Sequence, residues 1–328
     1  MNALGSMCHC VRHFMSYKAA VVQAGSVPFH TEQTVDKACA LIAEASREGA
    51  RLIVFPEAFV SGYPKGCHFG APVGYRTPEG REDFFRYQAG AIVVPGPETD
   101  RLGEAAREAD AFVVIGVMER DAGTLYCTVV FLGSDGKLQG KHRKLMPTVS
   151  ERVIWGFGDG STLPVFDTDL GKIGSVICWE NYMPAMRMAM YGKGINIYCA
   201  PTADDRDVWL ASMQHIAQEG RCFVFSACQY IKRSAYEADY RCALGDDPEV
   251  VLMRGNSVIV DPMGRIVAGP YVDGETILYA DIDLDLIAHT KFEFDVVGHY
   301  ARPDIFTLAV NEKAMAPVQY LNDTGSEA

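Results

Sequence analysis

The sequence alternates short apolar runs with amphipathic segments, and this alternation limits the possible folds more than any other feature. The run at 17–27 is typical of a buried strand, whereas residues 31–49 carry apolar side chains at helical spacing. Thr31 and Thr34 are candidate caps for that helix, and its final Gly49 is a natural stop. A second apolar run, RLIVF, follows at once. Strand, helix and strand in this order favour a layered α/β fold.

The same alternation continues through most of the chain. No linker rich in Ser, Gly or Pro interrupts it. We therefore predict one catalytic α/β domain over residues 17–306, an N-terminal extension over 1–16 and a C-terminal tail over 307–328. Further helices are predicted at 98–110, 184–194 and 206–221, and further strands at 111–120, 125–136, 172–178, 195–203, 222–230, 256–269 and 276–284.

The charge balance limits the partners of the protein. With 42 acidic and 30 basic residues the formal net charge is −12, which argues against nucleic acid or an anionic membrane as the main partner. No apolar stretch approaches the ~18 residues of a spanning helix, and the N-terminus lacks the apolar core of a signal peptide. We expect a cytoplasmic protein with reduced cysteines. Most of the ten, such as Cys127, lie in apolar runs and are expected to be packing residues.

Two residues of catalytic type stand where apolar strands end. Cys178 closes GSVIC and precedes a polar turn and a helix that begins near Pro184. At such a corner free backbone N–H groups can stabilise an anion, although one more buried strand cysteine is an equally simple interpretation. Glu57 closes RLIVFP. Poor solvation there would raise the pKa of its carboxyl group toward the range of a general base, whereas the alternative is a solvated strand end.

A basic run offers the third candidate. Lys144 ends the run KHRK, which could be a solvated surface, but the apolar residues Leu145 to Pro147 follow it directly. Glu151 comes seven residues after Lys144 and could pair with it. Cysteine, glutamate and lysine together supply the nucleophile, base and cation that acyl-transfer chemistry on a carbon–nitrogen bond requires.

Three other motifs carry weaker signals. The glycine-rich GFGDG at 156–160 lacks the flanking strand and helix of a dinucleotide loop and is interpreted as an ordinary loop. The Cys/His cluster at 8–13 has no second ligand pair at zinc spacing, so we predict no metal site. The segment 202–205, with Asp204 and Asp205, is expected to cap the helix that follows it.

The blocks around the three candidates resemble the signature blocks of the nitrilase family. These blocks are FPEAF at 55–59, HRKLMPT at 142–148 and GSVICWEN at 174–181. The order Glu, Lys, Cys matches the family, as does the gap of 34 residues from Lys144 to Cys178 (178 − 144). The resemblance extends over roughly residues 17–307 and is greatest to plant nitrilases and their bacterial relatives. The segment from Lys232 to Arg254 departs from the family in length and wording, and we expect it to shape the pocket or an oligomer contact.

The resemblance implies a fold, a chemistry and a set of site residues. The fold is an αββα sandwich whose protomers pair to extend it, so we expect a homo-oligomer, either a dimer or a larger assembly such as a filament. Cys178 is then the nucleophile, Glu57 the general base, Lys144 the electrostatic stabiliser and Glu151 the residue that orients this lysine. The backbone N–H of Trp179 would help to stabilise the developing charge. Residues in matching blocks near the pocket, expected to bind substrate, are Tyr63, Trp155, Trp179, Pro201 and Thr202.

The implied reaction is hydrolysis of an organic nitrile to the carboxylic acid and ammonia, through a thioimidate and a thioester on the cysteine. It needs no metal or organic cofactor. β-Cyanoalanine, arylacetonitriles and arylpropionitriles are all compatible substrates. The alternatives are an amidase or carbamoylase of the same superfamily, a catalytically silent α/β binding protein, and a metal-dependent hydrolase.

Overall fold

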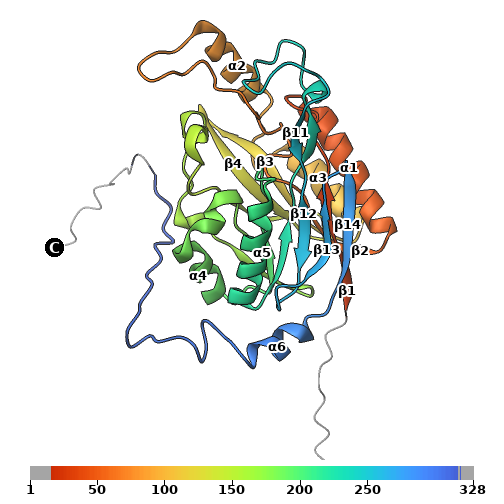
Figure 1. Ribbon diagram of the computed structural model, residues 1–328, viewed down its shortest axis with the longest axis vertical. Helices are drawn as coiled ribbons and strands as arrows, with labels where there is room; N and C mark the ends of the chain where they lie inside the picture. Colours follow the sequence, from red (N-terminus) through yellow and green to blue (C-terminus); the bar gives the residue numbers. More distant parts are fainter. Residues whose placement is uncertain (1–15, 317, 319–328) are drawn as a thin grey trace, which may run out of the picture.

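Two β-sheets lie face to face in this computed structural model, which describes residues 16–316 and 318 (Figure 1). Within that part of the chain each sheet has six strands. The first has the order β14-β1-β2-β3-β4-β5, with β1 Tyr17–Gln23, β2 Ala50–Val54, β3 Phe112–Asp121, β4 Thr124–Leu132, β5 Leu138–Arg143 and β14 Thr276–Ile282. The second has the order β13-β12-β9-β8-β7-β6, with β6 Val165–Thr168, β7 Gly171–Ser175, β8 Ile197–Cys199, β9 Phe223–Ser226, β12 Ser257–Val260 and β13 Ile266–Tyr271.

Helices cover the outer face of each sheet. Helices α1, Thr31–Arg47, and α3, Pro97–Glu108, pack on the first sheet, and α4, Pro184–Gly192, and α5, Asp207–Gly220, pack on the second. Strand β1 shows how the sequence builds these layers, because its side chains alternate between the two faces. Ala19 and Val21 are buried between the sheets, whereas Ala20 and Val22 are buried under the helices. The αββα sandwich that the sequence predicted is confirmed.

Several local predictions were incomplete or wrong. The basic run 141–144 belongs largely to strand β5, which was not predicted, and helix α2, Pro78–Ala89, was also missed. The strand predicted at 172–178 ends at Ser175, and the 3₁₀ helix η3, Cys178–Tyr182, follows it. Short elements outside the sandwich are η1 Val149–Val153, η2 Gly160–Thr162, η4 Arg233–Ala235 and the paired strands β10 Tyr230–Lys232 and β11 Val251–Arg254.

Both predicted helix caps were wrong. Helix α1 has His30 at its N-cap, and the Thr34 hydroxyl donates to the backbone carbonyls of Val27 and His30 from inside the first turn. Helix α5 has Arg206 at its N-cap without a side-chain cap hydrogen bond. The carboxylate of Asp204 instead accepts hydrogen bonds from other side chains near the active site, as described below.

The chain after the last helix, α6 Asp285–Lys291, follows the surface without forming a helix or strand over residues 292–316. It returns to the sandwich near residue 315, where the Met315 N–H donates to Asp159 (2.7 Å) and Glu312 pairs with Lys193. The predicted N-terminal extension, including the Cys/His cluster at 8–13, lies outside the described residues except for residue 16. No helix in the described ranges is both long and apolar enough to cross a membrane.

Candidate active site

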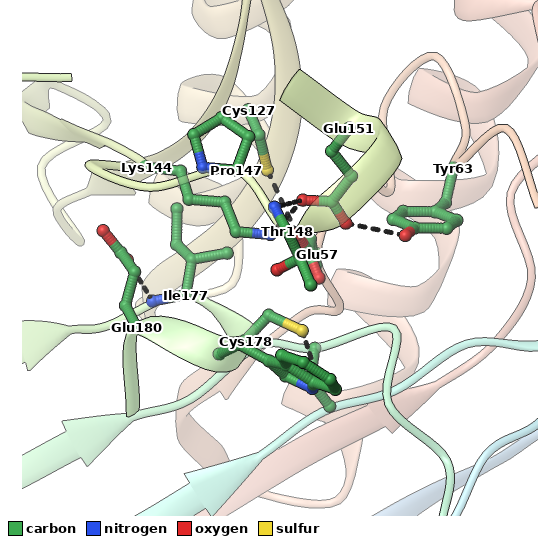
Figure 2. A network of polar contacts seen from close by, with 12 residues as sticks. Glu57, Tyr63, Cys127, Lys144, Pro147, Thr148, Glu151, Ile177, Cys178 and Glu180 are labelled. Atoms are coloured by element: carbon green, nitrogen blue, oxygen red, sulfur yellow. Dashed lines mark hydrogen bonds and ion pairs between the residues drawn. The ribbon is translucent and has the colours of Figure 1, made fainter. Parts of the chain in front are cut away.

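The site lies between the two sheets, where loops from both converge (Figure 2). Glu57 follows β2 and Lys144 follows β5, both in the first sheet, whereas Cys178 follows β7 in the second sheet. Lys144 Nζ lies 2.6 Å from Glu57 Oε1 and 2.8 Å from Glu151 Oε2. Cys178 lines one cavity together with Glu151, so the structure brings together all four residues that the sequence singled out for catalysis.

Glu57 is completely buried, so the interpretation of a solvated strand end is wrong. Its Oε1 atom accepts from Lys144 and from the thiol of Cys127 (Sγ to Oε1, 3.4 Å). Its Oε2 atom has no hydrogen-bond partner among the residues described here. Burial raises the pKa of Glu57, and Lys144 only partly offsets this effect. One carboxylate oxygen is thus held in place while the other remains available to accept a proton.

The backbone around Glu57 depends on a glycine in the neighbouring strand. Gly116 of β3 lies beneath the loop, where an added Cβ atom would lie 2.3 Å from the Pro56 carbonyl oxygen and 2.8 Å from Glu57 Cα. Only glycine permits so close an approach. Ala58, next to Glu57, takes a positive φ of 47°, a sparsely populated conformation for alanine. Packing against β3 therefore fixes a strained loop that carries the carboxylate.

Lys144 is also fully buried, so the interpretation of a solvated basic run is wrong for this residue. Burial opposes its charge, but the carboxylate of Glu57, the sulfur of Cys178 and the carboxylate of Glu151 together raise the pKa of Lys144 well above its ordinary value. The ammonium group also lies 5.3 Å from the centroid of the Trp155 ring. The lysine is therefore a buried cation held in place by two carboxylates and an aromatic ring.

Glu151 is held by donors on both oxygens. The Tyr63 hydroxyl donates to Oε1 (2.7 Å), and the backbone N–H of Thr148 and the ammonium of Lys144 donate to Oε2 (2.6 and 2.8 Å). The Thr148 contact closes the first turn of η1, which presents the carboxylate toward Lys144. This geometry fits a residue that orients the lysine.

Cys178 occupies a strained corner rather than a strand end. It opens η3 with a positive φ of 49°, and its N–H donates to the Pro201 carbonyl (2.9 Å). Strain of this kind in a non-glycine residue is common at nucleophiles. The Thr202 hydroxyl donates to Sγ (3.1 Å). Burial and the nearby Glu57 carboxylate raise the pKa of Cys178, so the resting group is a thiol that needs a base.

A cavity of about 190 Å³ opens beside Cys178. Of the five predicted substrate-binding residues, Tyr63 and Trp179 line it. The other three contact catalytic residues instead: Trp155 contacts Lys144, and Pro201 and Thr202 contact Cys178. A second cavity of about 340 Å³ shares Tyr63, Lys65 and Glu151 with the first. The cavity beside Cys178 therefore adjoins a larger one, and these three residues border both.

Asp204, which was interpreted from the sequence as part of a helix cap, lies at this cavity. Asp204 Oδ2 accepts from the Trp179 indole N–H (2.8 Å), and Arg206 binds both oxygens of the same carboxylate. The guanidinium also lies 5.2 Å from the centroid of the Trp179 ring. Asp204 and Arg206 thereby fix the orientation of the tryptophan at the mouth of the cavity.

The segment 232–254, which was expected to shape the pocket or an oligomer contact, braces the loop that carries Tyr63. The Tyr236 hydroxyl donates to the Tyr63 carbonyl (2.6 Å), and the Tyr240 hydroxyl donates to the Lys65 carbonyl (2.8 Å). The two tyrosine rings stack on each other with centroids 4.3 Å apart. This segment therefore contributes to the shape of the pocket through the backbone of residues 63–65.

Comparison with known proteins gives a consistent result. Residues 18–292 match the carbon-nitrogen hydrolase family. The chain is 62% identical to nitrilase blr3397 of Bradyrhizobium diazoefficiens, covering 91% of this chain and 93% of that protein, and 60% identical to an aliphatic nitrilase of Sinorhizobium fredii, covering 92% and 98%. It is 55% identical to the bifunctional nitrilase/nitrile hydratase NIT4B of Nicotiana tabacum, covering 95% and 90%.

Solved structures share the fold. Nit3 of Saccharomyces cerevisiae, a member of the nitrilase superfamily, superposes with a TM-score of 0.67 at 25% identity over 87% of this chain and 96% of that one. A carbon-nitrogen hydrolase of Helicobacter pylori superposes with a TM-score of 0.69 at 20% identity, covering 90% and 98%. With the family match over most of the chain and relatives at 55–62% identity, this protein belongs to the carbon-nitrogen hydrolase family.

Proposed function

We propose that this enzyme is a nitrilase that converts an organic nitrile to the carboxylic acid and ammonia, with Cys178 as nucleophile, Glu57 as general base and Lys144 as electrostatic stabiliser. The observation that carries the proposal is the buried Glu57–Lys144–Glu151 group between the sheets at Cys178, in which one Glu57 oxygen has no hydrogen-bond partner among the described residues. Among the relatives compared above, all three bear the name nitrilase, which favours a nitrile over an amide substrate.

The first half of the reaction forms a thioimidate. Glu57 Oε2 takes the proton of the Cys178 thiol as Sγ bonds to the nitrile carbon, and the proton is passed to the nitrile nitrogen. Lys144 stabilises the charge that develops on this nitrogen, together with the backbone N–H of Trp179 at the start of η3. Glu151 keeps the ammonium group in position during the step.

The second half consumes two waters. The first, activated by Glu57, adds to the thioimidate and gives a tetrahedral carbon that carries hydroxyl, amino and sulfur groups. Loss of ammonia leaves a thioester, which the second water hydrolyses to the acid and the free thiol. Loss of the thiol instead would release the amide. The tobacco relative bears the name nitrilase/nitrile hydratase, which fits a branch of this kind.

Other parts of the proposal concern the whole protein. We propose a cytoplasmic homo-oligomer that acts on a small nitrile, with residues 17–306 as the catalytic domain and 307–328 as a tail. Exposed apolar side chains follow α6, among them Phe292, Ile305, Phe306 and Met315, and these could be covered by a second copy. Light scattering tests this assembly. A fully active monomer at 35.9 kDa would contradict it.

The replacement of Cys178 by alanine tests the proposed function. Cys178→Ala removes a small buried group, so the variant should fold, while ammonia release from a panel of nitriles should fall to background. Circular dichroism serves as the folding control. Wild-type activity should also survive EDTA, unlike that of a metal-dependent hydrolase. Ammonia release by the alanine variant near the wild-type rate would overturn the assignment.

A further inference from the structure

A buried carboxylate joins the two loops that carry the lysine and the cysteine. Glu180 lies in η3 and has no solvent exposure. Its Oε1 atom accepts from the backbone N–H of Leu145 (2.5 Å). Its Oε2 atom accepts from the backbone N–H of Ile177 (2.8 Å), as Figure 2 shows. Leu145 directly follows Lys144, and Ile177 directly precedes Cys178. One carboxylate thus binds the neighbours of both catalytic residues.

A buried histidine completes this connection. His142 Nε2 lies 2.9 Å from Glu180 Oε2, and Nδ1 lies 2.5 Å from the Thr162 carbonyl oxygen. Both ring nitrogens therefore face acceptors, and both can donate only if the ring is a protonated imidazolium. Burial opposes that charge, but Glu180 and the Thr162 carbonyl raise the pKa of His142 above its ordinary 6.5. The contact is then a buried ion pair between β5 and η3.

We propose that Glu180, together with His142, is a positioning residue that fixes the separation of Lys144 and Cys178. This inference rests on the proposed function, because it assigns these two groups to one reaction. Glu180 does not line the cavity beside Cys178 and acts only through its neighbours.

The need for such a connection follows from the fold. Lys144 directly follows β5 of the first sheet and Cys178 follows β7 of the second, and the layer between the sheets is largely an apolar core. Apolar packing is non-directional and does not by itself hold two polar groups in one exact geometry. Charged hydrogen bonds are directional and short. A displacement of about 1 Å between reacting groups can lower a rate about 100-fold.

Glu180→Gln tests the proposal, with Glu119→Gln as the matched control. Glutamine keeps the size of the side chain, but its amide nitrogen would face a donor at Ile177 or Leu145, so one of the two contacts is lost. Glu119 is also a buried carboxylate that binds β5, through Lys141 and Arg143, but its hydrogen bonds to the described residues stay within the first sheet and do not reach the loop that carries Cys178. For each variant we would measure kcat per folded enzyme, KM and the ratio of acid to amide.

We expect kcat per folded enzyme to fall about 100-fold in Glu180→Gln with little change in KM. The acid-to-amide ratio should change as well, because Lys144 is displaced relative to the intermediate on sulfur. A merely structural loss would reduce the amount of folded enzyme but would not move this ratio. In Glu119→Gln both quantities should equal those of the wild type.

His142→Gln provides a second variant if Glu180→Gln fails to fold. Glutamine can donate to Glu180 or to Thr162 but carries no charge, so a smaller change in kcat and a ratio change in the same direction are expected. The proposal is overturned if both quantities match Glu119→Gln in whichever of the two variants folds. Cys178→Ala separates this outcome from a failure of the proposed function, since only the latter leaves the alanine variant active.

Discussion

Two buried glutamates bind basic side chains of β5 and of the residue that directly follows it, yet their environments differ. Glu119 accepts four hydrogen bonds, from Lys141 (2.5 Å), from two nitrogens of Arg143 (2.9 and 2.6 Å) and from Thr128 (2.9 Å). Glu57 accepts from Lys144 and the weakly donating thiol of Cys127, and its Oε2 atom has no partner in the described structure. Both carboxylates are nearly or completely inaccessible to solvent.

The difference appears in the pKa values. Burial would raise the pKa of Glu119, but hydrogen bonds from Arg143 and Lys141 lower it below the usual 4.5. Burial raises the pKa of Glu57, which shares its single lysine with Glu151. A buried carboxylate with enough donors is a permanent anion and stabilises the fold. One with too few donors retains affinity for a proton, which is the property of a general base.

The largest expected effect comes from exchanging each carboxylate for its amide. Glu57→Gln should lower kcat about 10³-fold, while stability changes little, because the amide cannot take the thiol proton and both oxygens of the nearby Glu151 already accept hydrogen bonds. Glu119→Gln should leave kcat unchanged but destabilise the fold by about 3 kcal/mol, since Lys141 and Arg143 lose their common partner. Steady-state kinetics and chemical unfolding measure the two effects. Similar losses of kcat in both variants would remove the distinction between the two sites.

The pH dependence of stability should differ in sign between the two glutamates. The folded-state pKa of Glu119 is lowered, so its carboxylate stabilises the fold above about 4.5, and this contribution is lost as the pH falls through the folded value. The folded-state pKa of Glu57 is raised, so its contribution is present below about 4.5 and is lost as the pH rises through the folded value. Unfolding of both amide variants and the wild type between pH 2 and 8 measures this difference.

The second expected effect distinguishes two lysines of the same chain segment, Lys141 and Lys144. Lys144→Arg should lower kcat about 10²–10³-fold, nearly as much as Lys144→Ala, because a planar guanidinium cannot place a compact charge between Glu57 and Glu151. Lys141→Ala should retain most of the activity, because Arg143 still neutralises Glu119. Equal losses at both lysines would indicate a general basic patch instead of one catalytic cation.

Much of the fold could be predicted from sequence because its strands are apolar and its helices amphipathic. Strand β5 could not, since the run KHRK resembles a solvated surface. Its alternate side chains reach two different buried carboxylates, Glu119 for Lys141 and Arg143, and Glu180 for His142. These carboxylates come from β3 and η3, far from β5 in sequence, so only the tertiary structure reveals that the basic residues are neutralised.

The candidate site, too, could be predicted from the sequence only in part. Glu57, Lys144, Glu151 and Cys178 could be selected from the sequence because they stand in recognisable blocks. The contribution of Cys127 was missed, because a cysteine in an apolar run is usually a packing residue, and Glu180 was read only as part of a polar turn. The positive φ of Cys178 was also not foreseen, since a strained corner depends on the loops that enclose it. Contacts between loops that are distant in the sequence leave no pattern in the local sequence.

The smallest expected effect concerns Glu151, which is intermediate between Glu57 and Glu119. It shares Lys144 with Glu57, but like Glu119 it accepts hydrogen bonds from several donors. Glu151→Gln should loosen the lysine and lower kcat about tenfold, the equivalent of one charged hydrogen bond of about 1.5 kcal/mol. It should also change the fraction of amide, because expulsion of ammonia or of the thiol depends on whether nitrogen or sulfur holds the proton. Chromatography of both products from several nitriles, for the variant and the wild type, measures this partition. If the variant is slower on every substrate but its acid-to-amide ratio is constant, then Glu151 acts on the first addition alone, and the partition is controlled by Glu57.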